Sequence, residues 1–435
     1  MNQFIYNKAV SGEAVALFSS INAPDLYEVF YDPDSSKFER IYQRYLSEGK
    51  QSGFVSARKL IDLSNRQRVE TRQYHYHPEL MSAHTPFKQR ILQSNLCMEI
   101  ALHTHPYNNP FELNSTDGYT VDGDVIDGEI GLCTLAGVIV PNITSDEEYA
   151  RVAYNALVVI DYCIAHSSYL FPHLEYTAKA RRSAGVGILG MAQLIASKGL
   201  KYSSQEGRNF IHELAETHSW HLINASLRLG KELGNCTWAY KTKWADGWLP
   251  IDTYKKTIDP FITVERKRDW ESLRKEIVAN GGLRNTTLVA HMPGESSCVG
   301  SGITNGVYPI RSLYSVKGSG NTSVFFVVPH SEDYKYEMAY DIAHVDMVRA
   351  YAILQMHTDQ AISADYYIDM SKGSVDADEL FELVLNVYRF GLKTSYYMRS
   401  KLNSYDSSGS LVTPVSPAPL IIQEEEGCAG GACTL

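Results

Sequence analysis

Hydrophobic residues recur every three to four positions in several stretches of this chain, which is the spacing of an amphipathic helix. The stretches that show this spacing, each expected to form a helix, are 37–50, 56–71, 146–166, 184–199, 205–233, 265–280, 346–362 and 376–390. The helix at 146–166 begins with three consecutive acidic residues, which the positive end of the helix dipole favours. Gly391 follows the last helix and is expected to end it.

Several stretches outside these helices are expected to form strands, and the first of them, 128–140, is a candidate for a buried strand. They occupy 128–140, 285–293, 321–329 and 392–398. Residues 93–104 are expected to be extended or to form a loop. Residues 105–128 are rich in Asn, Asp, Gly and Pro and predict an insertion at the surface. Since strands and helices alternate through most of the chain, the pattern favours an α/β sheet or an α/β barrel.

Composition and charge narrow the class of protein. Of the 435 residues, 44% are hydrophobic and 21% are charged, so the chain can bury a large core. The net charge is −10 and no long basic run occurs, which argues against a protein that coats nucleic acid. No stretch of about 18 apolar residues and no secretory leader are found, so we expect a cytoplasmic protein that does not enter a membrane.

The last part of the chain has a different composition. Residues 404–435 are rich in Ser, Pro, Gly and Glu, which predicts a flexible tail. Cys428 and Cys433 lie in this tail, where two accessible thiols suit thiol–disulfide exchange, with adventitious metal binding as the alternative. The other five cysteines are widely spaced, so neither a secreted disulfide framework nor a zinc site is predicted.

The sharpest local cluster of chemically active side chains lies at 94–99. If this stretch is extended, Asn95, Cys97 and Glu99 share one face, because side chains alternate along a strand. An amide can donate hydrogen bonds, a thiol can do redox or radical chemistry, and a carboxylate can take a proton. The alternative is a partly buried strand that carries a free core cysteine.

Two further patterns are less specific when taken alone. Residues 292–297 follow a predicted strand, and their backbone N–H groups and hydroxyls could bind an anion or could simply cap a helix. Tyr396 and Tyr397 form an aromatic pair that could serve packing, since the chain has 29 tyrosines and a second such pair at 366–367.

Seven motifs occur in order along the chain: SNLCMEIAL, GEIGLCTLAGVIV, LPIDTYKK, GLRNTTLVAHMPGESS, TNGVYPIR, GLKTSYY and the terminal GCAGGAC. Together they resemble the large (α) subunit of class I, aerobic-type ribonucleotide reductase of the bacterial and phage kind, from about residue 4 to residue 435. The resemblance implies that 1–403 is the C-terminal half of a ten-stranded α/β barrel with a central thiol-bearing finger loop, followed by the flexible tail. The implied activity is radical reduction of ribonucleoside diphosphates to 2′-deoxyribonucleoside diphosphates.

The resemblance also implies a role for each matching residue. Cys97 would be the transient thiyl radical that removes the 3′ hydrogen, Glu99 the general base on the 3′ hydroxyl, and Asn95 a hydrogen-bond partner of the ribose. Tyr396 and Tyr397 would relay the radical, with Tyr396 nearer to Cys97. The residues implied to bind the substrate, mainly its diphosphate, are Ser94, Pro293, Gly294, Glu295, Ser296 and Ser297.

The redox cycle implied by the resemblance needs further thiols and partners. Cys133 would be one of two thiols that supply electrons and become a disulfide. Cys428 and Cys433 would reduce this disulfide and would then be reduced by thioredoxin or glutaredoxin. The chain itself would bind no cofactor, because a metal-containing β subunit would supply the radical.

Two parts of the family pattern have no match in this sequence. No residue corresponds to the redox partner of Cys133, and the N-terminal nucleotide-sensing domain and the first half of the barrel are not matched. We therefore expect a separate N-terminal polypeptide that completes the α subunit and holds most of the allosteric nucleotide site, and an α dimer. Half a barrel exposes sheet edges, so the chain alone is expected to associate or aggregate.

Two alternatives stay open at the level of sequence. The same barrel could belong to a cobalamin-dependent or glycyl-radical reductase, although the pair Tyr396–Tyr397 favours the class that depends on a β subunit. The chain could also be an inactive remnant that serves as a binding or regulatory module. The joint presence of every matching residue named above argues against such decay.

Overall fold

The computed structural model describes residues 2–30, 32, 34–71, 75–106, 128–319, 322–372 and 375–401. The predicted tail at 404–435, with Cys428 and Cys433, lies outside the described residues. So does nearly all of the predicted insertion at 105–128.

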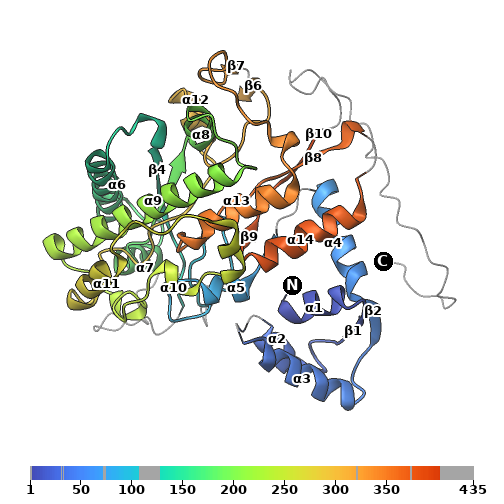
Figure 1. Ribbon diagram of the computed structural model, residues 1–435. Coiled ribbons are helices and arrows are strands. Elements are labelled where there is room, and N and C mark those ends of the chain that lie inside the picture. The colour runs from blue at the N-terminus through green and yellow to red at the C-terminus, as the bar shows by residue number, and fades with distance from the viewer. Residues whose placement is uncertain are drawn as a thin grey trace.

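A row of parallel segments forms the centre of the described chain (Figure 1). Strand β4 (Thr134–Ile139) pairs in parallel with β5 (Ala184–Leu189), and β8 (Tyr366–Asp369) pairs in parallel with β10 (Met398–Lys401). Parallel bridges from Val186 to Val289 and from His291 to Ile362 join the two pairs through residues 288–291. The row therefore contains five parallel segments within the described residues, which is what half of a ten-stranded barrel would contribute.

Helices connect the successive segments of the row, as parallel strands require. The helices between β4 and residues 288–291 are α6 (Asp146–His166), α7 (Pro172–Arg181), α8 (Met191–Ser197), α9 (Gln205–Leu233), α10 (Pro250–Thr253) and α11 (Trp270–Ala279). Those later in the chain are α12 (Glu295–Gly300), α13 (His344–Met356) and α14 (Ala377–Arg389). Short 3-10 helices occur at Val140–Asn142, Ala239–Lys241, Lys256–Phe261, Ala339–Asp341 and Met370–Lys372.

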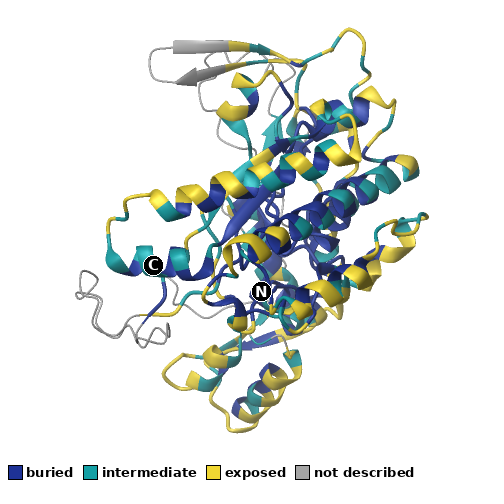
Figure 2. Cartoon of the chain, turned by 90° about the vertical axis from the view of Figure 1, so that its left-hand side faces the viewer, coloured by how far each residue is buried: buried dark blue, intermediate teal, exposed yellow. Residues whose placement is uncertain are grey.

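Helices α6 and α14 bury one face and expose the other, whereas α9 and α13 are buried over most of their length (Figure 2). The main core joins apolar residues of α6, α9 and α13 to those of β4, β5 and β8. Close approach is allowed by Gly187 of β5, because a Cβ at that position would lie 2.7 Å from the carbonyl oxygen of Ala290. Any larger residue there would push two segments of the row apart.

The N-terminal residues form a smaller unit beside α14. Its elements are α1 (Gln3–Val10), β1 (Ala14–Leu17), α2 (Pro24–Val29), α3 (Ser35–Ser47), β2 (Gly53–Ser56), α4 (Ala57–Thr71), β3 (His75–Tyr76) and α5 (Pro78–Ala83). Strands β1 and β2 are antiparallel, and β3 pairs with β9 (Thr394–Ser395). Phe4, Phe38 and Tyr42 share a core with Phe381 and Tyr388 of α14, which attaches this unit to the row.

Several predicted elements are confirmed within a few residues. These are the helices expected at 37–50, 56–71, 146–166, 205–233 and 376–390, found as α3, α4, α6, α9 and α14. The helix expected at 265–280 begins only at Trp270. The strand expected at 321–329 is β7 (Thr322–Val327), but it pairs with β6 (Tyr314–Ser319) in an antiparallel hairpin outside the row.

Other predictions were wrong in type or length. Residues 184–199 do not form one helix, because Gly190 (φ +82°) separates the fully buried strand β5 from α8. A strand buried on both faces has no polar positions, so its apolar run imitates a buried helix. The helix predicted at 346–362 ends at Met356, and the strand predicted at 128–140 is limited to β4.

Two predicted strands near the site are also shorter than expected. Residues 285–293 contribute bridges at Val289 and His291 rather than a full strand. The strand predicted at 392–398 is divided between β9 and β10, with Tyr396 and Tyr397 between them. No helix in the described part of the chain is long and apolar enough to cross a membrane.

Candidate active site

Residues 94–100 form a tight loop rather than the extended strand that would place three side chains on one face. Met98 has a left-handed conformation (φ +67°), and its N–H donates to the carbonyl oxygen of Asn95 at 3.2 Å. The side-chain oxygen of Asn95 accepts from the N–H of Ile100 at 3.1 Å, and the hydroxyl of Ser94 donates to the Ile100 carbonyl at 2.7 Å. The side chains of residues 95, 97 and 99 therefore do not alternate as in a strand, contrary to the prediction, but the turn still brings Asn95 and Glu99 together. We call residues 94–100 the finger loop.

The finger loop is fixed to the row at the start of its fourth segment. The N–H of Ala361 donates to the carbonyl oxygen of Glu99 at 2.8 Å, and the N–H of Ala101 donates to the side chain of Gln360 at 2.9 Å. Ile100, Ala101 and other apolar residues pack beneath the loop. The loop therefore has a buried base, whereas Leu96 at its tip is 73% exposed.

Glu99 lies on the buried side of the finger loop, where both of its carboxylate oxygens accept hydrogen bonds. Oε1 accepts from the amide of Asn95 at 2.8 Å, and Oε2 accepts from the hydroxyl of Ser363 at 3.2 Å. Burial raises the pKa of Glu99 above its ordinary value, and these hydrogen bonds oppose the rise. A carboxyl group tuned in this way is a stronger proton acceptor than an exposed one.

Cys97 is half-buried and meets the tyrosine pair of the last segment. The hydroxyl of Tyr396 lies 3.7 Å from the Cys97 sulfur, and the ring centroids of Tyr396 and Tyr397 are 3.9 Å apart. Burial raises the pKa of the Cys97 thiol, and the charges of Glu99, Glu295 and Asp365 raise it further. The thiol is therefore held in its protonated form, next to two phenol rings that contact each other at an interplanar angle of 36°.

Cys133 stands at the entry to β4 and faces β5. A Cβ at Gly185 would lie 3.2 Å from its sulfur. Burial raises the pKa of this thiol well above its ordinary value, and the charges of Glu99 and Asp359 add to the effect. Cys133 also packs against the apolar cluster that contains Ile100 and Ala101, at the base of the finger loop.

The turn at 293–297 follows the third segment of the row and includes the first residues of α12. Its backbone N–H groups at Gly294 and Glu295 donate to the side-chain oxygen of Asn305 at 2.7 and 3.0 Å. The amide of Asn305 donates in return to Glu295 at 2.9 Å. Pro293 has no N–H and shapes the turn without donating. The donors expected to meet an anion are thus partly engaged by a side chain that the sequence did not single out.

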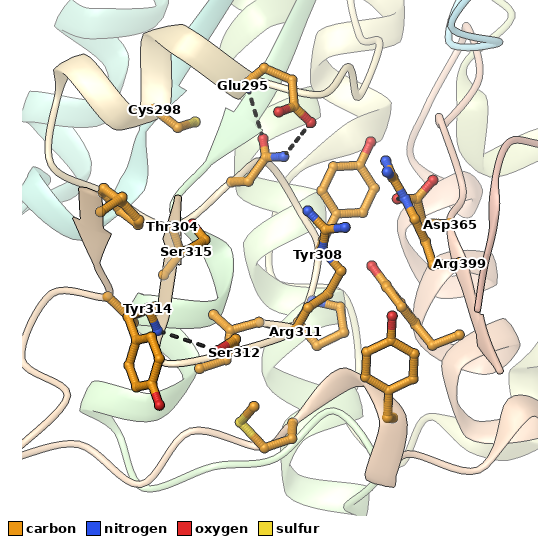
Figure 3. A pocket seen from close by; sticks show the side chains of 18 of the residues that line it. Glu295, Cys298, Thr304, Tyr308, Arg311, Ser312, Tyr314, Ser315, Asp365 and Arg399 are labelled. Atoms are coloured by element: carbon orange, nitrogen blue, oxygen red, sulfur yellow. Dashed lines mark hydrogen bonds and ion pairs between the residues drawn. The ribbon is translucent and has the colours of Figure 1, made fainter. Parts of the chain in front are cut away.

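A cavity of about 520 Å³ is lined in part by Tyr397, Glu295, Asp365 and Arg399. Figure 3 shows Glu295 and Cys298 at one end of this cavity and Asp365 and Arg399 on its wall. Tyr397 therefore contacts both the Tyr396 ring and the cavity.

The structure thus brings together Asn95, Cys97, Glu99, Tyr396 and Tyr397. Cys133 packs at the base of the finger loop, and Glu295 of the turn at 293–297 lines the same cavity as Tyr397. Sequence reasoning missed the residues that support them: Asn305, Gln360, Ser363, Asp365 and Arg399. Only Asn305 lay within one of the seven motifs, and no spacing rule marked the others. Among the described residues, no group of His, Cys, Asp and Glu could hold a metal ion.

The chain matches the family described as "Ribonucleotide reductase, barrel domain" over residues 1–334 and 327–398, and it belongs to that family. It is 34% identical to the ribonucleoside-diphosphate reductase subunit alpha of Haemophilus influenzae, over 100% of this chain and 55% of that protein. It is 34% identical to the ribonucleoside-diphosphate reductase 1 subunit alpha of Escherichia coli K12, over 100% and 56%. The corresponding subunit of Enterobacteria phage T4 is 31% identical, over 95% and 54%. The chain thus spans about half the length of these relatives.

Proposed function

We propose that this chain carries the catalytic half of a ribonucleoside-diphosphate reductase and reduces ribonucleoside diphosphates to 2′-deoxyribonucleoside diphosphates. The observation that carries the proposal is the continuous line from Tyr397 to Tyr396 to the Cys97 thiol, which ends beside Glu99 and Asn95. Membership of the family and the names of the relatives support the same activity.

In the proposed reaction, the Cys97 thiyl radical takes the hydrogen atom from C3′ and becomes a thiol again. The Glu99 carboxylate accepts the proton of the 3′ hydroxyl, and Asn95 orients the ribose. The 2′ hydroxyl then takes up a proton from one of a pair of thiols and leaves as water, since a radical at the neighbouring carbon weakens its bond. The two thiols supply this proton, a second proton that goes to C2′ and two electrons, and become a disulfide. Glu99 returns its proton to the 3′ oxygen, and Cys97 returns the hydrogen atom to C3′ and is again a thiyl radical.

The turn at 293–297 is proposed to hold the substrate diphosphate. The amides of Gly294 and Glu295 are engaged by Asn305, so the hydroxyls of Ser296 and Ser297 are the donors we expect to contact phosphate oxygens. Ser94 stabilises the base of the finger loop through Ile100, and we propose that it supports substrate binding in that way.

Several parts of the cycle are proposed to come from outside the described residues. A thiol from the part of the relatives' length that this chain does not cover would pair with Cys133. Cys428 and Cys433 of the tail would reduce the resulting disulfide and pass the oxidation to thioredoxin or glutaredoxin. A β subunit with a metal centre would supply the radical to Tyr397. The remaining part of an α subunit would provide the allosteric nucleotide site and complete an α dimer.

The test is an assay of CDP reduction with this chain, the remaining part of an α subunit, a β subunit and a dithiol reductant. Cys97→Ser should abolish formation of dCDP, because an alcohol does not form the radical under these conditions. Cys163→Ser is the matched control, since this thiol is exposed on α6, and it should retain activity. Undiminished dCDP formation by the Cys97→Ser variant would overturn the proposal.

A further inference from the structure

Tyr396 and Tyr397 are held in the fold in different ways. Tyr396 is only 5% exposed, so packing fixes its ring, and its N–H donates to the carbonyl oxygen of Ala364 at 2.8 Å. Tyr397 is half-buried and lines the cavity of about 520 Å³. Its ring therefore needs support from polar neighbours if it is to stay in contact with the Tyr396 ring.

One carboxylate contacts both the backbone and the neighbourhood of Tyr397. Oδ1 of Asp365 accepts from the N–H of Tyr397 at 3.3 Å, and Oδ2 accepts from Nε of Arg399 at 2.6 Å. The Arg399 guanidinium lies 4.5 Å from the centroid of the Tyr397 ring. Asp365 thus binds the backbone of Tyr397 directly and also fixes the Arg399 guanidinium, which covers the Tyr397 ring. Figure 3 shows Asp365 and Arg399 side by side.

The surroundings of this pair make it more than a surface ion pair. Asp365 is only 4% exposed, and Arg399 is half-buried at the cavity wall. In such a site a charged hydrogen bond loses little strength to solvent, and its geometry is well defined. A guanidinium over a phenol ring adds a further attraction, which grows as water is excluded.

We propose that Asp365 and Arg399 form a positioning pair that holds the Tyr397 ring against Tyr396 and so sets the efficiency of radical transfer into the site. This inference rests on the proposed function for its kinetic consequence, but the positioning itself does not require turnover. In the transfer, Tyr397 loses one electron and its phenol proton to the radical of the β subunit, which is thereby reduced. Tyr397 then regains a hydrogen atom from the phenol of Tyr396.

The pair should also respond to pH through Asp365. Burial raises the pKa of Asp365 to about 6, although Arg399, Arg311 and the N–H of Tyr397 each lower it. The other titratable groups that sense its charge are the phenols of Tyr308, Tyr351, Tyr366 and Tyr367 and the thiol of Cys97. Protonation would remove the charge that holds Arg399, so the support of Tyr397 should weaken below about pH 6.

The first arm of the test needs only the full chain. 3-Fluorotyrosine is placed at position 397, and its ¹⁹F resonance is followed as the pH is lowered. The resonance should shift with a midpoint near pH 6, and the shift should disappear in Asp365→Asn. Arg228→Gln is the matched control, because Arg228 also covers a tyrosine (Tyr154, 3.9 Å) and pairs with a carboxylate far from the site, and it should leave the titration unchanged.

The second arm measures CDP reduction in the complete complex. Asp365→Asn and Arg399→Gln should lower kcat by about tenfold or more with KM nearly unchanged, since a small displacement of a reacting group is costly. Arg399→Lys should restore part of the loss, because it keeps the positive charge without the planar stack. Arg228→Gln should have the wild-type rate.

The outcomes separate this inference from the proposed function. A ¹⁹F titration that is the same in wild type and Asp365→Asn would overturn the positioning role, whatever the activity. Wild-type kcat in Arg399→Gln, within an active complex, would overturn the inference and leave the proposed function intact. A wild-type complex that forms no dCDP would instead refute the proposed function, while the ¹⁹F arm would still decide whether the pair positions Tyr397.

Discussion

The finger loop and the entry to β4 each carry a thiol, but they are stabilised in different ways. Cys97 lies near the tip of a loop that is closed by hydrogen bonds from Asn95 and Ser94. Cys133 lies in a wall of the row, a few residues after Glu129, which pairs with Arg181 in a nearly solvent-free setting. The comparison indicates that the thiol proposed to meet the relay and the substrate lies on a loop closed by individual hydrogen bonds, whereas Cys133, the proposed redox thiol, follows a residue of a buried ion pair.

The two modes of stabilisation have different energetic consequences. A hydrogen bond between neutral groups contributes about 1 kcal/mol to stability. Removing one such bond should therefore loosen the finger loop without unfolding the protein. The Glu129–Arg181 pair is 6% and 3% exposed at its side chains, and removing one member of such a pair costs about 3–5 kcal/mol. Substitutions in the finger loop should therefore lower the activity, and substitutions at the entry to β4 should lower the free energy of unfolding.

The largest expected effect is on the relay that reaches the finger loop. Tyr396→Phe should lower turnover by about a thousandfold or more, because phenylalanine has no phenol hydrogen to exchange with Cys97. The measurement is kcat for CDP reduction together with a thermal melt. Tyr366→Phe is the control, since Tyr366 is fully buried in the adjacent strand β8 and should be nearly as active as the wild type. An active Tyr396→Phe enzyme would show that the line of residues is not the route.

The next effect concerns closure of the finger loop. Asn95→Ala removes the bonds to Glu99 (2.8 Å) and to the Ile100 N–H (3.1 Å), and should lower kcat by about a hundredfold through misplacement of Cys97 and Glu99. Hydrogen exchange at residues 96–100 should become faster. Asn224→Ala, which removes a comparable bond to the Trp220 carbonyl on α9, should leave both readouts unchanged. Unaltered exchange in Asn95→Ala would contradict the assigned closure.

The third effect tests the other side of the comparison. Glu129→Gln leaves the buried guanidinium of Arg181 without its counter-charge and should lower the free energy of unfolding by about 3 kcal/mol. Glu232→Gln removes a carboxylate from an exposed pair with Arg228 and should change it by about 1 kcal/mol or less. Urea denaturation measures both variants. If both variants lose the same free energy of unfolding, the buried pair at the entry to β4 contributes no more to stability than the exposed pair.

The smallest effect is a pH-dependent one at Glu99. Its pKa is raised in the folded state, so the stability that the neutral form supplies at low pH is lost as the pH rises through that raised pKa. Glu99→Gln should therefore increase Tm slightly at neutral pH and flatten the dependence of Tm on pH, while abolishing CDP reduction. Identical Tm-against-pH curves for the two proteins would show that the carboxylate carries no burial penalty.

The sequence predicted the long helices well, because a 3.6-residue period over many turns leaves little ambiguity, as for α6 and α9. The prediction failed where a segment is buried on all sides, because such a segment has no alternation of apolar and polar residues to show its type. Strand β5 has no polar face, and the pair Tyr396–Tyr397 lies between two short strands rather than in one. The parallel row depends on contacts between residues far apart in sequence, which periodicity does not record.

The candidate site shows the same division. The residues expected to do chemistry were identified because their motifs occur together, and the structure brings Asn95, Cys97, Glu99 and the two tyrosines into contact. Their supports were not identified, because Ser363 and Asp365 acquire their roles only through the fold. The expected alternation at 95–99 was wrong because side chains close the loop into a turn.

The central claim, that a radical passes through Tyr396 to the finger loop, can be tested directly with 3-aminotyrosine at position 396. This residue is oxidised more easily than tyrosine and so traps a radical that passes through it. When the complete complex is mixed with CDP and frozen within seconds, electron paramagnetic resonance should detect an aminotyrosyl radical that forms at the expense of the β-subunit radical. Normal dCDP formation by the same protein with no radical at position 396 would contradict the account.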